Sequence, residues 1–225
     1  MRYLETILPL YGSPEPVGCS QEEIAAMKAR FGALPAAVED FYRTAAKTPC
    51  FQWGQDDWIL PEHYQKWTWL ERTGALILLN ENQGVCQAGV LKKDLSLPDP
   101  PVYVTYKRDF SEWKPCAPAV SEFLAAALAY EAAFTHVAPC SPEEFYWFTP
   151  SEVAKVKAEL TRLPFSLLDW CSEMEITLYQ NAPDNLLVLM DFGAEDGEPQ
   201  ALYGAATQEG YQKLLAVAGG LGEAI

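Results

Sequence analysis

A run of apolar residues in the middle of the chain predicts the start of a β-sheet. Residues 75–79 are continuously apolar, as expected of a strand that is buried on both faces. Asn80, Asn82 and Gly84 follow, and these residue types tolerate the backbone angles of a tight turn. Residues 85–91 then return as a second strand, so the pattern predicts an antiparallel pair.

A third strand and a long helix are predicted after this pair. Residues 102–106 are rich in β-branched and aromatic side chains, which favours a strand. Pro100 and Pro101 precede it and belong to the connection, because proline has no N–H group to donate to a sheet. Residues 110–118 have the composition of a loop. Residues 119–135 are predicted to form a helix, with a core face that comprises Val120, Phe123, Leu124, Ala127 and Leu128.

Two helices are predicted before the sheet. Ser20 and Glu23 have the spacing of a capping box, and apolar residues follow at helical intervals up to Gly32. Pro35 is placed in the first turn of a second helix. The segment 49–71 holds four of the seven tryptophans and reads as loops with one or two short strands around Trp58.

A second unit is predicted to begin near Pro139. Thr149 and Glu152 have the spacing of another capping box, and Thr207 is placed to cap a last helix. Three strands are predicted between these helices, over residues 176–180, 186–192 and 201–206. The sequence therefore predicts an α+β fold with an antiparallel sheet packed by helices over residues 1–138. A C-terminal acidic helix–strands–helix extension over residues 139–225 is expected to pack on that core as one globular unit.

The charge of the chain limits its partners. The 225 residues include 31 acidic and 16 basic side chains, which gives a net charge of −15. Nucleic acid and anionic membrane surfaces attract basic proteins, so neither is an expected partner. The excess of negative charge favours a basic protein partner, or serves only solubility. The pattern leaves the oligomeric state open.

The remaining composition indicates no cofactor, no metal and no export. The six cysteines are widely scattered without a Cys-x-x-Cys pair, and no phosphate-binding glycine loop is present. The first residues lack the apolar segment of a signal peptide, and no run approaches the length of a membrane span. We therefore expect a cytoplasmic protein with reduced thiols.

Few residues suggest catalysis. Asp56, Asp57 and His63 could hold a metal ion, but a solvated loop is the favoured interpretation. Glu81 could act as an acid or base, although no partner group is apparent, and a role in stabilising the turn is favoured. No nucleophile motif of the Gly-x-Ser-x-Gly type occurs. We therefore expect no enzymatic activity. An enzyme of unrecognised type remains the alternative, and it would require these side chains to converge in a cleft.

A small group of basic residues stands near the predicted strand ends. Lys92, Lys93, Lys107 and Arg108 could form a basic patch. Lysines at the edge of a sheet more often prevent pairing with other chains, and this second interpretation is favoured.

The ordered set of motifs resembles the SUKH superfamily, which contains yeast cell-wall synthesis regulators of the Smi/Knr type and many bacterial immunity proteins. The resemblance covers residues 20–133. It rests on the helix that ends at Phe31-Gly32, on Leu34-Pro35 and Phe41-Tyr42, on the segment Leu79-Asn80-Glu81-Asn82-Gln83-Gly84-Val85, on Pro98-Asp99-Pro100-Pro101-Val102-Tyr103, and on Ser121-Glu122-Phe123-Leu124.

This resemblance implies a non-catalytic protein-binding module. The leading hypothesis is a cytoplasmic immunity protein that binds and blocks a toxin, such as a nuclease with a basic active site. The alternative is a regulatory or scaffolding protein like the yeast members. Candidate partner contacts are Trp53, Asp56, Asp57 and Trp58 as an aromatic and acidic anchor, together with Asp184, Glu195, Asp196 and Glu198 on turns.

Overall fold

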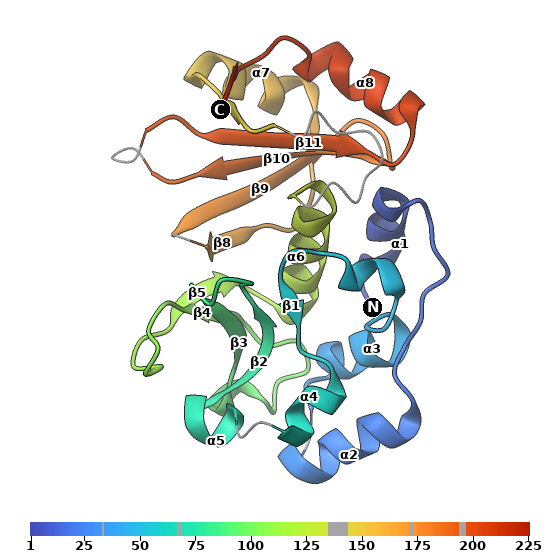
Figure 1. The fold of residues 1–225 in the computed structure, drawn as a ribbon, viewed down its shortest axis with the longest axis vertical. Coiled ribbons are helices and arrows are strands. Elements are labelled where there is room, and N and C mark those ends of the chain that lie inside the picture. The colour runs from blue at the N-terminus through green and yellow to red at the C-terminus, as the bar shows by residue number, and fades with distance from the viewer. Residues whose placement is uncertain (33, 67–68, 135–143, 172, 194–196) are drawn as a thin grey trace. The chain divides into compact units, whose positions relative to one another are not determined.

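The chain packs as two compact units (Figure 1). The computed structural model describes residues 1–32, 34–66, 69–134, 144–171, 173–193 and 197–225. The first unit comprises Met1–Tyr3 and Glu15–Leu124, and the second comprises Leu4–Pro14 and Ala125–Ile225. The division by contacts falls within the helix expected over residues 119–135. Pro139, near which the sequence predicts the second unit to begin, lies outside the described residues. The N-terminal segment joins the second unit, where the Tyr11 hydroxyl donates to the Leu128 carbonyl at 2.6 Å.

The described residues form two antiparallel sheets with helices, so the predicted α+β fold is confirmed. The sheet of the first unit has the strand order β1-β2-β3-β4-β5. The apolar run at its centre is buried as expected, and a glycine at position 89 lets β3 approach β2 closely, because a Cβ there would lie 2.5 Å from the Leu76 carbonyl oxygen. The strands are β1 (Asp57–Trp58), β2 (Ala75–Asn80), β3 (Gln87–Leu91), β4 (Val102–Thr105) and β5 (Lys114–Ala117).

The α-helices of the first unit begin where local signals place them, with two exceptions, and its two 3₁₀ helices were not predicted. The predicted capping box is confirmed, because the Ser20 hydroxyl accepts from the Glu23 N–H at 3.2 Å and the Glu23 carboxylate accepts from the Ser20 N–H at 2.8 Å. Two short helices in the tryptophan-rich segment were not predicted, since five or six residues are too few to show a helical period. The elements are α2 (Gln21–Phe31), α3 (Ala36–Thr44), η2 (Pro49–Gln52), α4 (Pro61–Lys66), α5 (Trp69–Thr73) and η3 (Lys92–Asp94).

The proline-rich connection before β4 holds the start of α6 (Val120–Phe134). The Asp99 carboxylate accepts from the Ser121 N–H at 2.9 Å and from the Ser121 hydroxyl at 2.6 Å. The Pro100 carbonyl accepts from the Val120 N–H at 2.8 Å. These bonds satisfy donors that the first turn of a helix leaves unpaired. The connection therefore serves the fold and fixes where the helix begins.

The second unit contains a larger sheet, with the strand order β12-β6-β11-β10-β9-β7 and with β8 paired to β9. The three predicted strands are confirmed as β9, β10 and β11. The other strands were not predicted, mostly because a two-residue strand shows no alternation. The strands are β6 (Tyr146–Trp147), β7 (Thr161–Arg162), β8 (Leu167–Trp170), β9 (Met174–Gln180), β10 (Asn185–Asp191), β11 (Gln200–Ala205) and β12 (Glu223–Ala224).

Two helices, α7 (Pro150–Glu159) and α8 (Gln208–Ala218), cover one side of this sheet (Figure 1). Their Val156 and Leu214 pack with Leu187 and Tyr203 of the sheet in one buried cluster. The predicted cap of α8 is confirmed, because the Thr207 hydroxyl accepts from the Gly210 N–H at 3.0 Å. The unit also contains α1 (Leu4–Ile7) and η1 (Leu8–Tyr11).

Glu152 joins the start of α7 to the C-terminal segment, and we expect the substitution Glu152→Gln to destabilise the second unit. Its carboxylate accepts from the Thr149 N–H at 2.9 Å and from the Gly222 N–H at 2.8 Å. These bonds lower the pKa of Glu152 below its ordinary value of 4.5, and the bond from the Gly222 N–H has the largest effect. The variant should lose about 1 kcal/mol of unfolding free energy at neutral pH, measured by urea denaturation.

The pH dependence provides a second readout. The contribution of a carboxylate with a lowered pKa is present above its ordinary pKa and is lost as the pH falls through the folded-state value. Stability of the unsubstituted protein should therefore fall below about pH 4.5 more steeply than that of Glu152→Gln. Glu159→Gln, at an exposed position of α7, is the matched control. Equal stability of Glu152→Gln and the control at neutral pH would contradict the assignment.

Candidate interaction surface

The polar turn between β2 and β3 is held from within by Glu81. This buried carboxylate accepts from the Gln83 N–H and from the Val85 N–H, both at 2.9 Å. Gly84 has a φ of +73°, which glycine adopts without strain, and its N–H donates to the Glu81 carbonyl at 2.9 Å. The predicted turn-stabilising role of Glu81 is confirmed. The turn presents Asn82, Gln83 and Val85 to solvent in a defined conformation.

The loop that carries Trp53 is fastened to this turn. The Asn82 N–H donates to the Asp56 carboxylate at 3.3 Å, and the Gln55 amide donates to the Asn82 side-chain oxygen at 3.3 Å. β1 then pairs with β2, with Asp57 opposite Asn80. We use the name Trp53 surface for the exposed side chains of this loop and turn, which are Trp53, Asp57, Asn82, Gln83 and Val85.

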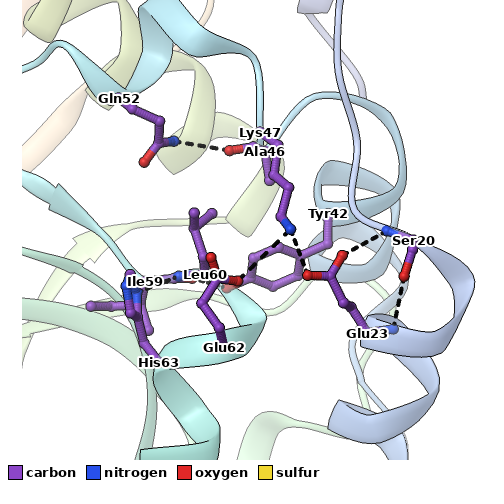
Figure 2. A network of polar contacts seen from close by, with 10 residues as sticks. All are labelled: Ser20, Glu23, Tyr42, Ala46, Lys47, Gln52, Ile59, Leu60, Glu62 and His63. Atoms are coloured by element: carbon purple, nitrogen blue, oxygen red, sulfur yellow. Dashed lines mark hydrogen bonds and ion pairs between the residues drawn. The ribbon is translucent and has the colours of Figure 1, made fainter.

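A polar network holds the loop at its two ends (Figure 2). Before Trp53, the Gln52 amide donates to the Ala46 carbonyl at 2.9 Å. After it, the Tyr42 hydroxyl donates to the Ile59 carbonyl at 2.5 Å, and the Leu60 N–H donates to Nδ1 of His63 at 3.0 Å. The loop is therefore ordered before any partner arrives, which lowers the entropic cost of binding.

An ion pair extends the same network to α2 (Figure 2). The Lys47 ammonium donates to the Glu23 carboxylate and lies 4.0 Å from a carboxylate oxygen of Glu62. The hydrogen bond between Lys47 and Glu23 raises the pKa of Lys47 and lowers the pKa of Glu23. Both groups are therefore charged at neutral pH, and their interaction joins α2 to the segment that precedes η2.

Two buried side chains of this region, Cys19 and Tyr42, have pKa values unsuited to nucleophilic catalysis. Burial raises the pKa of the Cys19 thiol to about 11, against the opposing effect of Lys47. Burial also raises the pKa of Tyr42 well above its usual range. A reactive thiol needs a lowered pKa, because the thiolate is the nucleophile. The shifts therefore fit structural side chains.

The four candidates from the tryptophan-rich segment divide between surface and interior. The Trp53 side chain is 67% exposed, and Asp57 is also exposed. Asp56 is only 7% exposed and accepts from the turn. Trp58 is 3% exposed and packs against Phe41 and Phe123, with ring centroids 5.5 and 6.4 Å away. In this structure Trp53 and Asp57 are accessible to a partner, whereas Asp56 and Trp58 support the fold.

The candidates on turns of the second unit also differ. Asp184 is half-buried, accepts from the Thr207 hydroxyl and lies against Gly210, so it fixes the start of α8. Glu198 is exposed in the connection between β10 and β11. Glu195 and Asp196 lie outside the described residues. Of these four, Glu198 is the one that the structure places on the surface.

The negative charge is concentrated in the second unit. Its residues include 16 acidic and 4 basic side chains, a net charge of −12. The first unit has 15 acidic and 12 basic side chains, a net charge of −3. Part of the acidic set lies at one end of the sheet, where Asp191 is opposite Glu175 and where the β10–β11 connection carries Glu198. Lys157 and Arg162 line a hollow with Glu175 and Asp191, so this end carries both signs.

Three of the four groups considered for catalysis or metal binding are engaged by backbone atoms, and the fourth, Asp57, is exposed. Asp56 and Glu81 accept from N–H groups of the turn, and His63 accepts from the start of α4. Within the part of the chain that the structure describes, no group of three His, Cys, Asp or Glu residues is arranged to hold a metal ion. The described arrangement of these side chains therefore matches turn and helix stabilisation.

Comparisons with family models, curated proteins and solved structures found no match. The resemblance to the SUKH superfamily thus stays a prediction from motifs. No helix in the described ranges is both long and apolar enough to cross a membrane.

Proposed function

We propose that this chain is a non-catalytic protein-binding module, and that it acts as a cytoplasmic immunity protein of the SUKH type. In this proposal the chain binds a basic toxin domain, such as a nuclease, and blocks its active site. The Trp53 surface would provide the main contact. The acidic second unit would attract the partner over longer distances.

The observation that carries the proposal is the ordered and exposed Trp53. Tryptophan is over-represented among residues that dominate binding energy, and aromatic side chains are enriched at protein interfaces relative to the rest of the surface. Here the indole is 67% exposed, although the loop on both sides of it is fastened by hydrogen bonds. An anchor on a preorganised loop loses little conformational entropy when it inserts into a partner's pocket.

The charge distribution supports a basic partner. Asp57 is exposed next to the buried Trp58 and within the Trp53 surface. The chain as a whole carries a net charge of −15, and the second unit contributes −12 of it. Opposite net charges accelerate the encounter of two proteins and make the association rate depend on salt. Nuclease active sites are basic because they hold phosphate, so a nuclease would present a basic surface to this acidic chain.

The proposal predicts a complex with the product of any toxin gene that lies beside this gene. We expect titration calorimetry to give binding at micromolar concentrations in low salt. Trp53→Ala should weaken that binding by a factor of about 30, as expected of a central hot-spot residue. Asp57→Asn should slow association and reduce its dependence on salt, measured by stopped-flow fluorescence.

Leu97→Ala is the matched control, because Leu97 is another exposed apolar residue of the first unit. We expect this variant to bind within about twofold of the unsubstituted protein. Absence of binding at micromolar concentrations in low salt would contradict the proposed function. Equal losses for Trp53→Ala and Leu97→Ala would contradict the assignment of the Trp53 surface. If no toxin gene is adjacent, the same variants are compared by pull-down from the native host.

A further inference from the structure

β3 and β4 separate at one end of the first sheet and leave a groove between them. Their last paired residues are Gln87 and Thr105. Beyond this pair, one wall continues into the β2–β3 turn and the other into the loop after β4. The resulting hollow has a volume of about 120 Å³. We call it the basic groove and define it by Val85, Gln87, Thr105, Lys107, Arg108 and Phe110.

The two cations of the groove are exposed, and among the described residues neither has an ion-pair partner within 4.0 Å. Other cations of the first unit, such as Lys28 and Lys47, do form ion pairs in this structure. The cations Lys107 and Arg108 follow β4, which is paired on both sides and is not an edge strand. Protection of a sheet edge therefore does not account for their position.

The structure also separates the four basic residues that the sequence grouped into one possible patch. Lys92 and Lys93 follow β3 in η3, whereas Lys107 and Arg108 follow β4. Because β3 and β4 are antiparallel, the two pairs lie at opposite ends of the strands. One pair lines the groove and the other does not, and this makes Lys92 and Lys93 an internal control.

An aromatic side chain in the groove is held in a defined orientation. Phe110 has a φ of +59°, a conformation that bulky residues seldom adopt and that recurs at functional sites. The Phe110 N–H donates to the Lys107 carbonyl at 2.9 Å. Its ring is stacked on Trp113, with centroids 6.5 Å apart, and the Arg72 guanidinium lies 5.4 Å from its centroid. The apolar lining that Phe110 provides is therefore preorganised.

From this arrangement we infer that the basic groove binds a short acidic peptide segment of a protein partner. A carboxylate of the segment would contact Lys107 and Arg108, and a neighbouring apolar side chain would contact Phe110 and Val85. Val85 is 41% exposed and available for this contact. The inference goes beyond the proposed function, because it concerns a ligand of opposite charge and can be tested without a toxin.

Charge and size favour a peptide over nucleic acid. Only two cations line the groove, and Lys107 already interacts electrostatically with the neighbouring Asp109, whereas tight binding of a polyanion requires many phosphate contacts. The net charge of −15 repels a long polyanion over the whole molecule. A segment with one or two carboxylates meets much less repulsion. The volume of about 120 Å³ also suits an amino-acid side chain better than a nucleotide.

The test uses the full chain and two capped pentapeptides, Ala-Glu-Leu-Asp-Ala and its amide counterpart Ala-Gln-Leu-Asn-Ala. We expect the acidic peptide to bind with a Kd below about 1 mM in low salt, measured by nuclear magnetic resonance titration. Shift changes should be confined to residues 84–87 and 105–113. The amide peptide should bind at least about tenfold more weakly, since it lacks the charge-assisted hydrogen bonds.

Paired charge reversals separate local recognition from general electrostatics. Lys107→Glu with Arg108→Glu should weaken binding of the acidic peptide by about tenfold or more, whereas Lys92→Glu with Lys93→Glu should change it by about twofold or less. Phe110→Leu, which retains apolar volume, should weaken it by an intermediate factor. Equal affinity for both peptides, equal losses in both double variants, or tighter binding of a single-stranded oligonucleotide at the same salt would each overturn the inference.

Discussion

We expect the substitution Asn185→Ala to be among the most destabilising changes in the second unit. Asn185 is fully buried and uses its whole side chain in hydrogen bonds. Its oxygen accepts from the Asn181 N–H and the Ala182 N–H, both at 3.1 Å. Its amide group donates to the Asn181 side-chain oxygen at 2.7 Å and to the Gly210 carbonyl at 2.8 Å.

The expected loss of stability follows from the buried polar groups that lose their hydrogen-bond partner when Asn185 is replaced by alanine. Asn185 connects the β9–β10 turn to the first turn of α8, and its removal leaves two N–H groups and one carbonyl without their partner. A buried polar group that loses its hydrogen bond costs about 1–3 kcal/mol. We therefore expect a loss of at least about 3 kcal/mol of unfolding free energy, or a Tm lower by about 6–12 °C.

Calorimetric unfolding and amide hydrogen exchange measure this prediction. Exchange should accelerate in the β9–β10 turn and at the start of α8 before it does elsewhere in the second unit. Gln212→Ala is the control, because Gln212 is an exposed residue of α8. It should change stability by less than about 0.5 kcal/mol. If Asn185→Ala matched the control, the hydrogen-bond network would not exist in solution.

The corresponding prediction for the first unit is Gly18→Ala. A Cβ at this position would lie 1.8 Å from the carbonyl oxygen of Arg43, which is backbone and has no room to move away. The chain is pinned here, since the Cys19 N–H donates to the Tyr42 carbonyl at 2.6 Å and the Lys47 N–H donates to the Val17 carbonyl at 2.8 Å. We expect a loss of about 3 kcal/mol or more by urea denaturation.

This change should also loosen the loop that presents Trp53, because the polar network of Figure 2 includes Tyr42 and Lys47. Limited proteolysis between residues 52 and 57 should therefore become faster in Gly18→Ala. Val17→Ala is the matched control, because the Val17 side chain is 43% exposed and the substitution adds no atom. Unchanged stability of Gly18→Ala would show that the close approach to Arg43 is absent in solution.

Local signals in the sequence were sufficient to place the starts of several helices. The capping boxes at Ser20 and Thr149 and the cap at Thr207 all form as predicted. Each of these motifs depends on hydrogen bonds between residues only three positions apart. The apolar run of β2 was equally informative, because a strand buried on both faces has no polar alternation to interrupt it.

Elements whose stability comes from distant contacts were missed. β5 contains Pro115 and was predicted as part of a loop, yet it pairs with β4 at the edge of the first sheet, where proline is tolerated. The short helices α4 and α5 have no periodic pattern of their own. α4 is held in part by the Tyr64 hydroxyl, which bonds the Ile77 carbonyl of β2.

The candidate site shows the same division. Sequence reasoning selected Trp53 and Trp58 together, because both stand in one tryptophan-rich segment. The structure exposes Trp53 and buries Trp58 between Phe41 and Phe123, which are far from it in sequence. Asp56 and Asp57 separate in the same way, because successive residues near a strand point to opposite sides. The role of Asp184 at the start of α8 depended on Thr207, 23 residues away.

By itself, the sequence determined the α+β class, the helix caps, the central strands and the acidic excess, because these depend on composition and on residues a few positions apart. Only the tertiary structure decided which tryptophan is accessible, where the two units divide and which basic pair lines a groove. Those properties depend on burial and on strand pairing between distant residues, which the local sequence pattern does not determine.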